Sequence, residues 1–131
     1  MKALIVEDDL TSRMLLQELL RKFGNSHVAI NGTEAVEAVK IALDNNEPYD
    51  LICLDIMMPE MNGQEALKKI RAMEEKRGII STRGSKIIMT TSLADLNNVT
   101  SAYSNYCDAY IVKPVHGDTL YQELEKLELI Q

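Results

Sequence analysis

The sequence predicts an α/β protein in which a parallel sheet is covered by helices on both faces. Short apolar runs, each too brief for a helix, alternate along the chain with longer stretches of helical period. The length of 131 residues is that of one domain, and the 46% hydrophobic and 26% charged fractions are ordinary for a globular one. We therefore expect one domain over residues 1–131, with five strands and five helices in a doubly wound arrangement.

The strands are expected at the short apolar runs, several of which are rich in Ile and Val. In chain order they are Lys2–Val6, Ser26–Ile30, Leu51–Leu54, Lys86–Met89 and Ala109–Val112.

The first two helices carry start and stop signals. Residues 10–23 place apolar side chains at the spacing i, i+3, i+4 and i+7, and Gly24 ends that segment. The second helix follows Asn31-Gly32-Thr33, which offers a turn and an N-cap, and it ends before Pro48.

The remaining three helices are predicted by the same pattern. One follows the Asn62-Gly63 turn, the next is capped by Asp95, and the last opens near Gly117-Asp118. Their apolar faces are Ala66, Leu67, Ile70 and Met73; Leu96, Val99, Ala102 and Tyr103; and Leu120, Leu124 and Leu127.

Charge and cysteine usage exclude several classes of function. The formal net charge of −6 repels phosphate backbones and anionic membrane surfaces, so we expect no nucleic acid and no membrane as partner. Cys53 lies in an apolar run and is expected to be a reduced, buried residue. The first apolar run stops at Glu7, too early for a signal peptide or a membrane span, which indicates a cytoplasmic protein.

The connection from Gly78 to Ser85 is longer than usual between a helix and a strand. We expect a surface insertion with Ile79 and Ile80 packed back on the preceding helix, because long insertions cost little loop entropy. A loop that docks a partner is the alternative.

The chemistry of the sequence is concentrated where the predicted strands end. Glu7-Asp8-Asp9 follows the first strand, Asp55 the third, Thr90-Thr91-Ser92 the fourth and Lys113-Pro114 the fifth. Because the carboxyl ends of parallel strands meet at one edge of a sheet, these groups should lie together. Crowded carboxylates repel one another unless a cation lies among them, and a few oxygen ligands open to water are typical of Mg²⁺.

Four segments in this order resemble the receiver domain of response regulators, in the single-domain form of chemotaxis regulators. They are Val6–Asp9, Leu54–Gly63, Met89–Ser92 and Tyr110–Pro114, and the resemblance extends from Lys2 to about Leu127. It implies a flavodoxin-like sheet of strand order 2-1-3-4-5. It also implies a signalling switch, not an enzyme, which accepts a phosphoryl group on Asp55 from a histidine kinase or a histidine phosphotransfer protein.

The same resemblance implies the ligands of a Mg²⁺ cofactor. Asp8 and Asp9 match the acidic pair of the family, and Asp55 and the backbone carbonyl of Met57 complete the set. Glu7 matches an outer position that the family often fills with an acid.

Further residues match the parts of the family that respond to phosphorylation. Lys113 pairs with Asp55 beforehand and then contacts a phosphoryl oxygen, and a cis bond is implied between Lys113 and Pro114. Thr91 matches the switch hydroxyl, with Ser92 beside it as a secondary site residue. Tyr110 matches the aromatic residue that moves between outward and inward positions.

The downstream protein target is expected at a face formed by the fourth helix, the fifth strand and the fifth helix. That face carries four tyrosines, Tyr103, Tyr106, Tyr110 and Tyr121. Only three residues follow the fifth helix, which favours a stand-alone receiver for chemotaxis or a phosphorelay, although a receiver cut from a larger regulator stays open.

Two other functions fit the topology less well. A phosphohydrolase of the haloacid-dehalogenase type would need a second acid two residues after Asp55, where Met57 cannot transfer a proton. A flavin-binding domain would need a phosphate loop where Glu7-Asp8-Asp9 would repel the phosphate. Met57 and Leu93 occupy positions that, in the layout of the receiver family, admit or orient the hydrolytic water, so slow self-dephosphorylation is expected.

Overall fold

The chain forms a parallel sheet of five strands in a computed structural model that describes residues 1–58, 60–80, 83–96 and 106–131. The strand order is β2-β1-β3-β4-β5, as the resemblance implied. The bounds are β1 Ala3–Val6, β2 Ser26–Ala29, β3 Leu51–Asp55, β4 Lys86–Thr91 and β5 Ala109–Val112. All five strands are confirmed within two residues at each end, and β3 and β4 extend to include Asp55 and Thr91 themselves.

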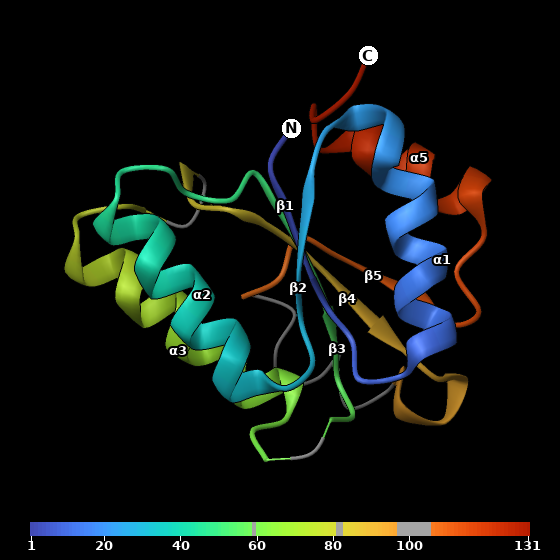
Figure 1. The fold of residues 1–131 in the computed structure, drawn as a ribbon, viewed down its shortest axis with the longest axis horizontal. Coiled ribbons are helices and arrows are strands. Elements are labelled where there is room, and N and C mark those ends of the chain that lie inside the picture. The colour runs from blue at the N-terminus through green and yellow to red at the C-terminus, as the bar shows by residue number, and fades with distance from the viewer. Residues whose placement is uncertain (59, 81–82, 97–105) are drawn as a thin grey trace.

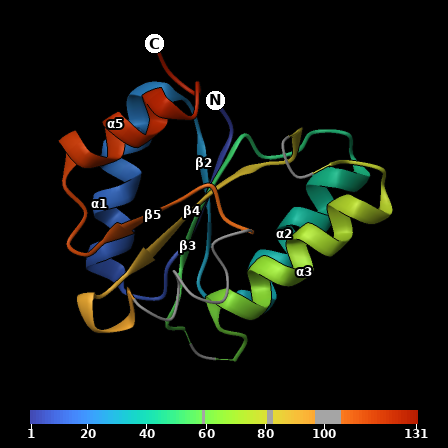
Figure 2. The same ribbon diagram turned by 180° about the vertical axis from the view of Figure 1, so that it is seen from behind.

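Helices cover both faces of this sheet. Helices α1 and α5 lie on one face and α2 and α3 on the other, where they pack side by side (Figures 1 and 2). Their bounds are α1 Leu10–Leu20, α2 Gly32–Asp44, α3 Gly63–Lys76 and α5 Gly117–Lys126. The described residues thus hold four α-helices where five were expected, because the expected fourth helix falls on residues 97–105, outside the described residues.

Two short 3₁₀ segments modify the expected helix ends. Arg21–Phe23 continues α1 as a 3₁₀ turn up to Gly24. Leu93–Asp95 forms a second one directly after β4, with Ser92 as its N-cap. The expected cap of the fourth helix by Asp95 stays a prediction, because residues 97–105 lie outside the described part of the chain. Of the helices in the described part of the chain, none is long and apolar enough to cross a membrane.

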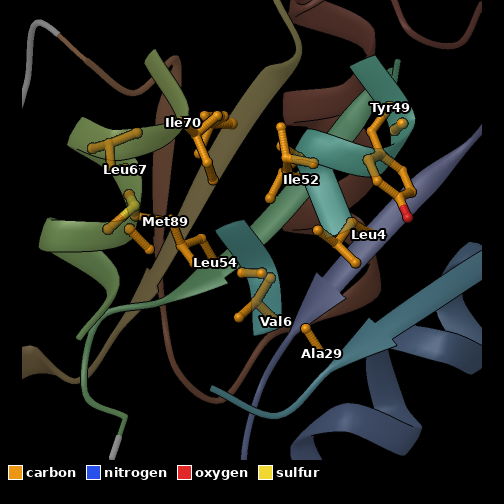
Figure 3. Packing of buried hydrophobic residues seen from close by; sticks show 14 of the residues in the cluster. Leu4, Val6, Ala29, Tyr49, Ile52, Leu54, Leu67, Ile70 and Met89 are labelled. Atoms are coloured by element: carbon orange, nitrogen blue, oxygen red, sulfur yellow. The ribbon is translucent and has the colours of Figure 1, made fainter. Parts of the chain in front are cut away.

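Each face of the sheet has its own apolar core. Side chains of a strand alternate between the faces, so Leu4, Val6, Ile52 and Leu54 pack under α2 and α3 (Figure 3), while Ile5 and its alternating neighbours pack under α1 and α5. The central strands β1 and β3 are therefore buried on both sides, which explains their continuous apolar sequence.

Cys53 belongs to the second core and is fully buried, as expected. Burial raises the pKa of its thiol to about 12. A thiol with such a pKa stays protonated at neutral pH, so Cys53 acts as a packing residue.

Three helices begin directly at the carboxyl edge of the sheet because a side chain caps each of them. The side-chain oxygens of Asp9, Asn31 and Asn62 accept hydrogen bonds from the backbone N–H groups three residues later, at 2.9, 2.8 and 2.9 Å. These caps satisfy donors that a helix N-terminus leaves free. The connections from β1 to α1 and from β2 to α2 are short, whereas residues 56–62 form a longer loop between β3 and α3.

The connection after α3 is held by a buried ion pair that the sequence pattern did not indicate. Glu74 is 2% exposed, and its carboxylate accepts from the Arg71 guanidinium and from the Ser85 backbone N–H, both at 2.8 Å. Arg71 also reaches Asp108 Oδ2 at 3.0 Å, so one side chain joins α3 to the segments before β4 and β5.

The expected packing of this connection is half right. Ile79 packs against the core beneath α3, whereas the side chain of Ile80 is 60% exposed. The backbone supplies the reason, because the Ile79 N–H donates to the Glu74 carbonyl and so folds only the first isoleucine back on the helix end.

Candidate functional site

Three carboxylates from two neighbouring strands meet at the carboxyl edge of the sheet. Glu7 and Asp8 follow β1, Asp55 ends β3, and one carboxylate oxygen of each lies within 4.8 Å of the others. The parallel register pairs Val6 with Leu54, which places the residues after Val6 beside Asp55. Glu7 is fully buried and Asp55 is 5% exposed, whereas Asp8 is exposed, so the cluster opens to solvent on one side only.

Lys113 brings one positive charge into this cluster from the end of β5. Its Nζ lies 2.5 Å from Glu7 Oε1 and 3.2 Å from Asp55 Oδ2. The expected ion pair with Asp55 is therefore present, and Glu7 is a second, nearer partner. The Lys113 backbone N–H donates to the Thr91 carbonyl at 2.7 Å, and the implied cis bond to Pro114 is confirmed.

The charges of the cluster do not balance. Burial, together with the neighbouring Asp55 carboxylate, raises the pKa of Glu7 above its usual value, and the hydrogen bond from Lys113 only partly opposes this. Burial by itself would lower the pKa of Lys113, but the hydrogen bond with Glu7 and the negative charges of Asp55 and Glu7 outweigh it and leave that pKa raised. Three carboxylates face one ammonium, and the excess negative charge favours a bound cation.

The donor set fits Mg²⁺. All the candidate ligands are oxygens, the type that this cation prefers, and the exposed Asp8 leaves room for the waters that it keeps. Glu7 Oε1 is buried and is contacted by the Lys113 ammonium, so a cation bound at this cluster would share the carboxylates with that lysine.

The expected pairing of Asp8 with Asp9 as metal ligands stays a prediction, and of these two residues it is Asp8 that lies in the cluster. The carboxylate of Asp9 turns away to cap α1, where its Oδ2 accepts from the Ser12 backbone N–H at 2.9 Å. This contact lowers the pKa of Asp9. Glu7, which was expected at an outer position, lies inside the cluster, where its carboxylate contacts the Lys113 ammonium.

The residues around Asp55 have different degrees of access to solvent. The Met57 backbone N–H donates to Asp55 Oδ1 at 3.3 Å, which places the start of the following loop beside the carboxylate. The Met57 side chain is 64% exposed and that of Leu93 is 75% exposed, so both stand in solvent. Neither side chain therefore belongs to the core.

Of the expected switch residues, Thr91 ends β4 and Tyr110 lies within β5. Thr91 is buried, and its hydroxyl donates to the Ser92 carbonyl at 3.0 Å, while the Ser92 hydroxyl donates to Asp95 at 2.8 Å. Tyr110 is 39% exposed.

The expected tyrosine face is only partly present among the described residues. Tyr106 and Tyr110 are exposed, and Tyr103 lies outside the described residues. Tyr121 does not belong to this face, because its hydroxyl donates to the Leu19 carbonyl at 3.1 Å and its ring contacts Phe23 edge to face. It packs α5 against α1.

A doubly wound flavodoxin-like sheet with a buried acidic cluster and one lysine at its carboxyl edge defines the class of protein. The sequence profile of the response regulator receiver domain matches residues 3–125. The chain belongs to this family, whose members serve two-component and phosphorelay signalling.

Individual relatives agree with this assignment. A chemotaxis protein CheY homolog of Campylobacter jejuni is 34% identical over 130 residues, which cover 95% of this chain and 90% of the homolog. The hybrid signal transduction histidine kinase G of Dictyostelium discoideum is 35% identical over 118 residues, 88% of this chain but only 3% of that protein. Among solved structures, the CheX–CheY–BeF₃–Mg²⁺ complex of Borrelia burgdorferi has a TM-score of 0.79 at 25% identity, covering 99% of this chain and 90% of that one.

Proposed function

We propose that this receiver domain accepts a phosphoryl group on Asp55 and thereby switches the contacts that it makes with a downstream protein. The observation that carries the proposal is the shared ammonium of Lys113, which lies 2.5 Å from Glu7 and 3.2 Å from Asp55 in a buried acidic cluster. Such a cluster neutralises an incoming phosphoryl group once a divalent cation joins it. The family membership and the Mg²⁺ named with a CheY relative support the same function.

The donor is a phosphohistidine of a histidine kinase or a phosphotransfer protein. A carboxylate oxygen of Asp55 forms a bond to phosphorus, the bond from phosphorus to the imidazole nitrogen breaks, and that nitrogen keeps the electron pair. Lys113 then faces a phosphoryl oxygen. The hybrid kinase that resembles this chain supports a donor of this class.

The metal ligands are Glu7, Asp8 and Asp55, together with the Met57 carbonyl. When bound there, Mg²⁺ supplies positive charge to the phosphoryl oxygens. Asp9 is omitted from the ligand set because its carboxylate caps α1.

The response begins at Thr91. Phosphorylation adds about −1.5 to −2 charge and new acceptor oxygens at the site. The Thr91 hydroxyl now donates to the Ser92 carbonyl, a partner that it can exchange for a phosphoryl oxygen. This exchange draws the end of β4 inward and lets the exposed Tyr110 follow, which changes the surface on which Tyr106 and Tyr110 are exposed.

The test is phosphoryl uptake from acetyl phosphate with Mg²⁺, followed by intact mass. We expect the gain of one phosphoryl group, labile to alkali, in the wild type and none in Asp55→Asn, which is nearly isosteric but lacks the nucleophile. Labelling of Asp55→Asn to the same stoichiometry would contradict the assignment. Many turnovers on phosphate esters by the wild type would favour a phosphohydrolase instead.

A further inference from the structure

The acceptor loop, residues 56–62, is supported from outside by the first turn of α2. The structure describes this loop except for Pro59, and the loop carries the Met57 carbonyl of the proposed metal site. The Gly32 backbone N–H donates to the Met61 carbonyl at 3.1 Å. Because Gly32 is the first residue of α2, its N–H has no partner within the helix and is free to make this bond.

A glycine is required at this contact for reasons of space. A Cβ on Gly32 would lie 2.1 Å from the Met61 carbonyl oxygen and 2.8 Å from the carbonyl carbon. Gly32 is not among the glycines with positive φ, so its lack of a side chain serves the close approach and not an unusual backbone conformation. Two of the obstructing atoms are backbone and the third is the Met61 Cβ, and none of them can swing aside as the end of a side chain would.

The base of the acceptor loop is closed independently. The Gly63 N–H donates to the Ile56 carbonyl at 2.8 Å, and a Cβ on Gly63 would lie 2.1 Å from the Asp55 carbonyl oxygen. Glu60, within the loop, has a φ of 66°, a conformation that non-glycine residues keep only when their surroundings impose it. Because the acceptor loop is strained at Glu60 and closed at its base, its position also depends on the hydrogen bond between the Gly32 N–H and the Met61 carbonyl.

We propose that Gly32 is a positioning residue that sets the place of the acceptor loop, and through it the Met57 carbonyl, for cation binding and phosphoryl transfer at Asp55. This inference rests on the proposed function. A Cβ at position 32 would lie 2.1 Å from the Met61 carbonyl oxygen, whereas non-bonded atoms of this kind lie about 3.5 Å apart. Relieving this overlap requires Met61 to move by about 1 Å, and α2 moves by the remainder. The shift reaches Met57 through described residues, because Met61 lies two residues before Gly63, the Gly63 N–H is bonded to the Ile56 carbonyl, and Met57 follows Ile56. Misplacement by about 1 Å is enough to slow a positioned reaction by about 10²-fold.

The test compares Gly32→Ala with Gly117→Ala in the whole chain. Gly117 is the first residue of α5 as Gly32 is of α2, so both variants add the same methyl group at the same helix position. At Gly117 the nearest atom to the new Cβ is the flexible end of Leu19, at 3.2 Å. The dissociation constant of Mg²⁺ is measured by titration calorimetry, the phosphorylation rate with acetyl phosphate, and the melting temperature in EDTA.

We expect Gly32→Ala to weaken Mg²⁺ binding and to slow phosphorylation by tenfold or more, and Gly117→Ala to change neither. A Mg²⁺ affinity and a rate in Gly32→Ala equal to those of the wild type would overturn the inference. If the wild type itself bound no Mg²⁺ and took up no phosphoryl group, the proposed function would fail, which is a different result.

A measurement on the wild type covers the case in which Gly32→Ala does not fold. In a Mg²⁺ titration followed by NMR, the amide signal of Gly32 should shift with the same dissociation constant as the site, because its hydrogen bond to Met61 reports the position of the loop. The amide of Gly117 serves as the control and should stay in place. A Gly32 amide that does not respond to Mg²⁺ would also overturn the inference.

Discussion

The ammonium of Lys113 lies closer to Glu7 than to Asp55, at 2.5 Å against 3.2 Å. Glu7 is fully buried at the end of β1, so it cannot exchange this partner for water. The lysine that would meet a phosphoryl group on Asp55 is thus held by a second carboxylate before the reaction. We expect Glu7 to influence both the stability of the protein without metal and its affinity for Mg²⁺.

Glu7→Gln should stabilise the metal-free protein and weaken Mg²⁺ binding. The raised pKa of Glu7 means that the fold disfavours its charged form. Its contribution to stability is therefore complete below the unfolded value of about 4.3 and is lost as the pH rises through the higher folded value.

Melting temperatures in EDTA between pH 4 and pH 8 check this prediction. The advantage of Glu7→Gln over the wild type should grow as the pH rises through this window, since glutamine does not titrate. If the difference in melting temperature between Glu7→Gln and the wild type stayed constant or shrank as the pH rises, the surroundings would not disfavour the charged form of Glu7.

Asp8 and Asp9 should separate in their effects. Asp8→Asn removes a carboxylate of the cluster and should weaken Mg²⁺ binding by about tenfold or more, the range known for the loss of groups around metal sites. Asp9→Ala removes the cap of α1 and should lower the melting temperature with the Mg²⁺ affinity unchanged. Asp9→Asn, which keeps the cap, is the matched control. Weaker Mg²⁺ binding in Asp9→Asn than in the wild type would show that Asp9 is a metal ligand after all.

The buried pair of Arg71 and Glu74 should matter for stability and not for phosphorylation. Glu74→Ala leaves a guanidinium that is 9% exposed without one of its partners and frees the Ser85 N–H. Breaking a buried pair in this way costs about 3–5 kcal/mol. Urea unfolding measures the loss, and acetyl phosphate labelling of the folded fraction should match that of the wild type. A loss below about 1 kcal/mol would mean that the pair is replaced by water at little cost.

The phosphorylated state should decay slowly. Met57 and Leu93, at the two positions that the family layout assigns to the hydrolytic water, have apolar side chains that offer this water no hydrogen bond, and both stand at the solvent rim. Met57→Asn combined with Leu93→Glu should shorten the lifetime of the acyl phosphate after free donor is removed. Met57→Leu with Leu93→Met keeps both positions apolar and should decay as the wild type does. If the acyl phosphate of Met57→Asn with Leu93→Glu decayed at the same rate as that of the wild type, Met57 and Leu93 would not determine its lifetime.

The sequence by itself determined the order of the elements and the edge at which the chemistry gathers. Apolar runs bounded by acids and turns identify β1 and β3, and the parallel arrangement brings Asp55 and Lys113 together, although they lie far apart in the chain. Both inferences depend on local patterns and on a general rule of sheet geometry, so they needed no knowledge of side-chain packing.

Only the tertiary structure decided which acid of Glu7-Asp8-Asp9 enters the site. The alternatives differ by one residue, and the choice depends on how the chain leaves β1: Glu7 turns toward Lys113, and Asp9 finds a partner at the start of α1. The burial of Glu74 and the contact of Gly32 with Met61 were equally hidden in the sequence. Each arises between segments that pack against one another only after folding, and local periodicity carries no information about such distances.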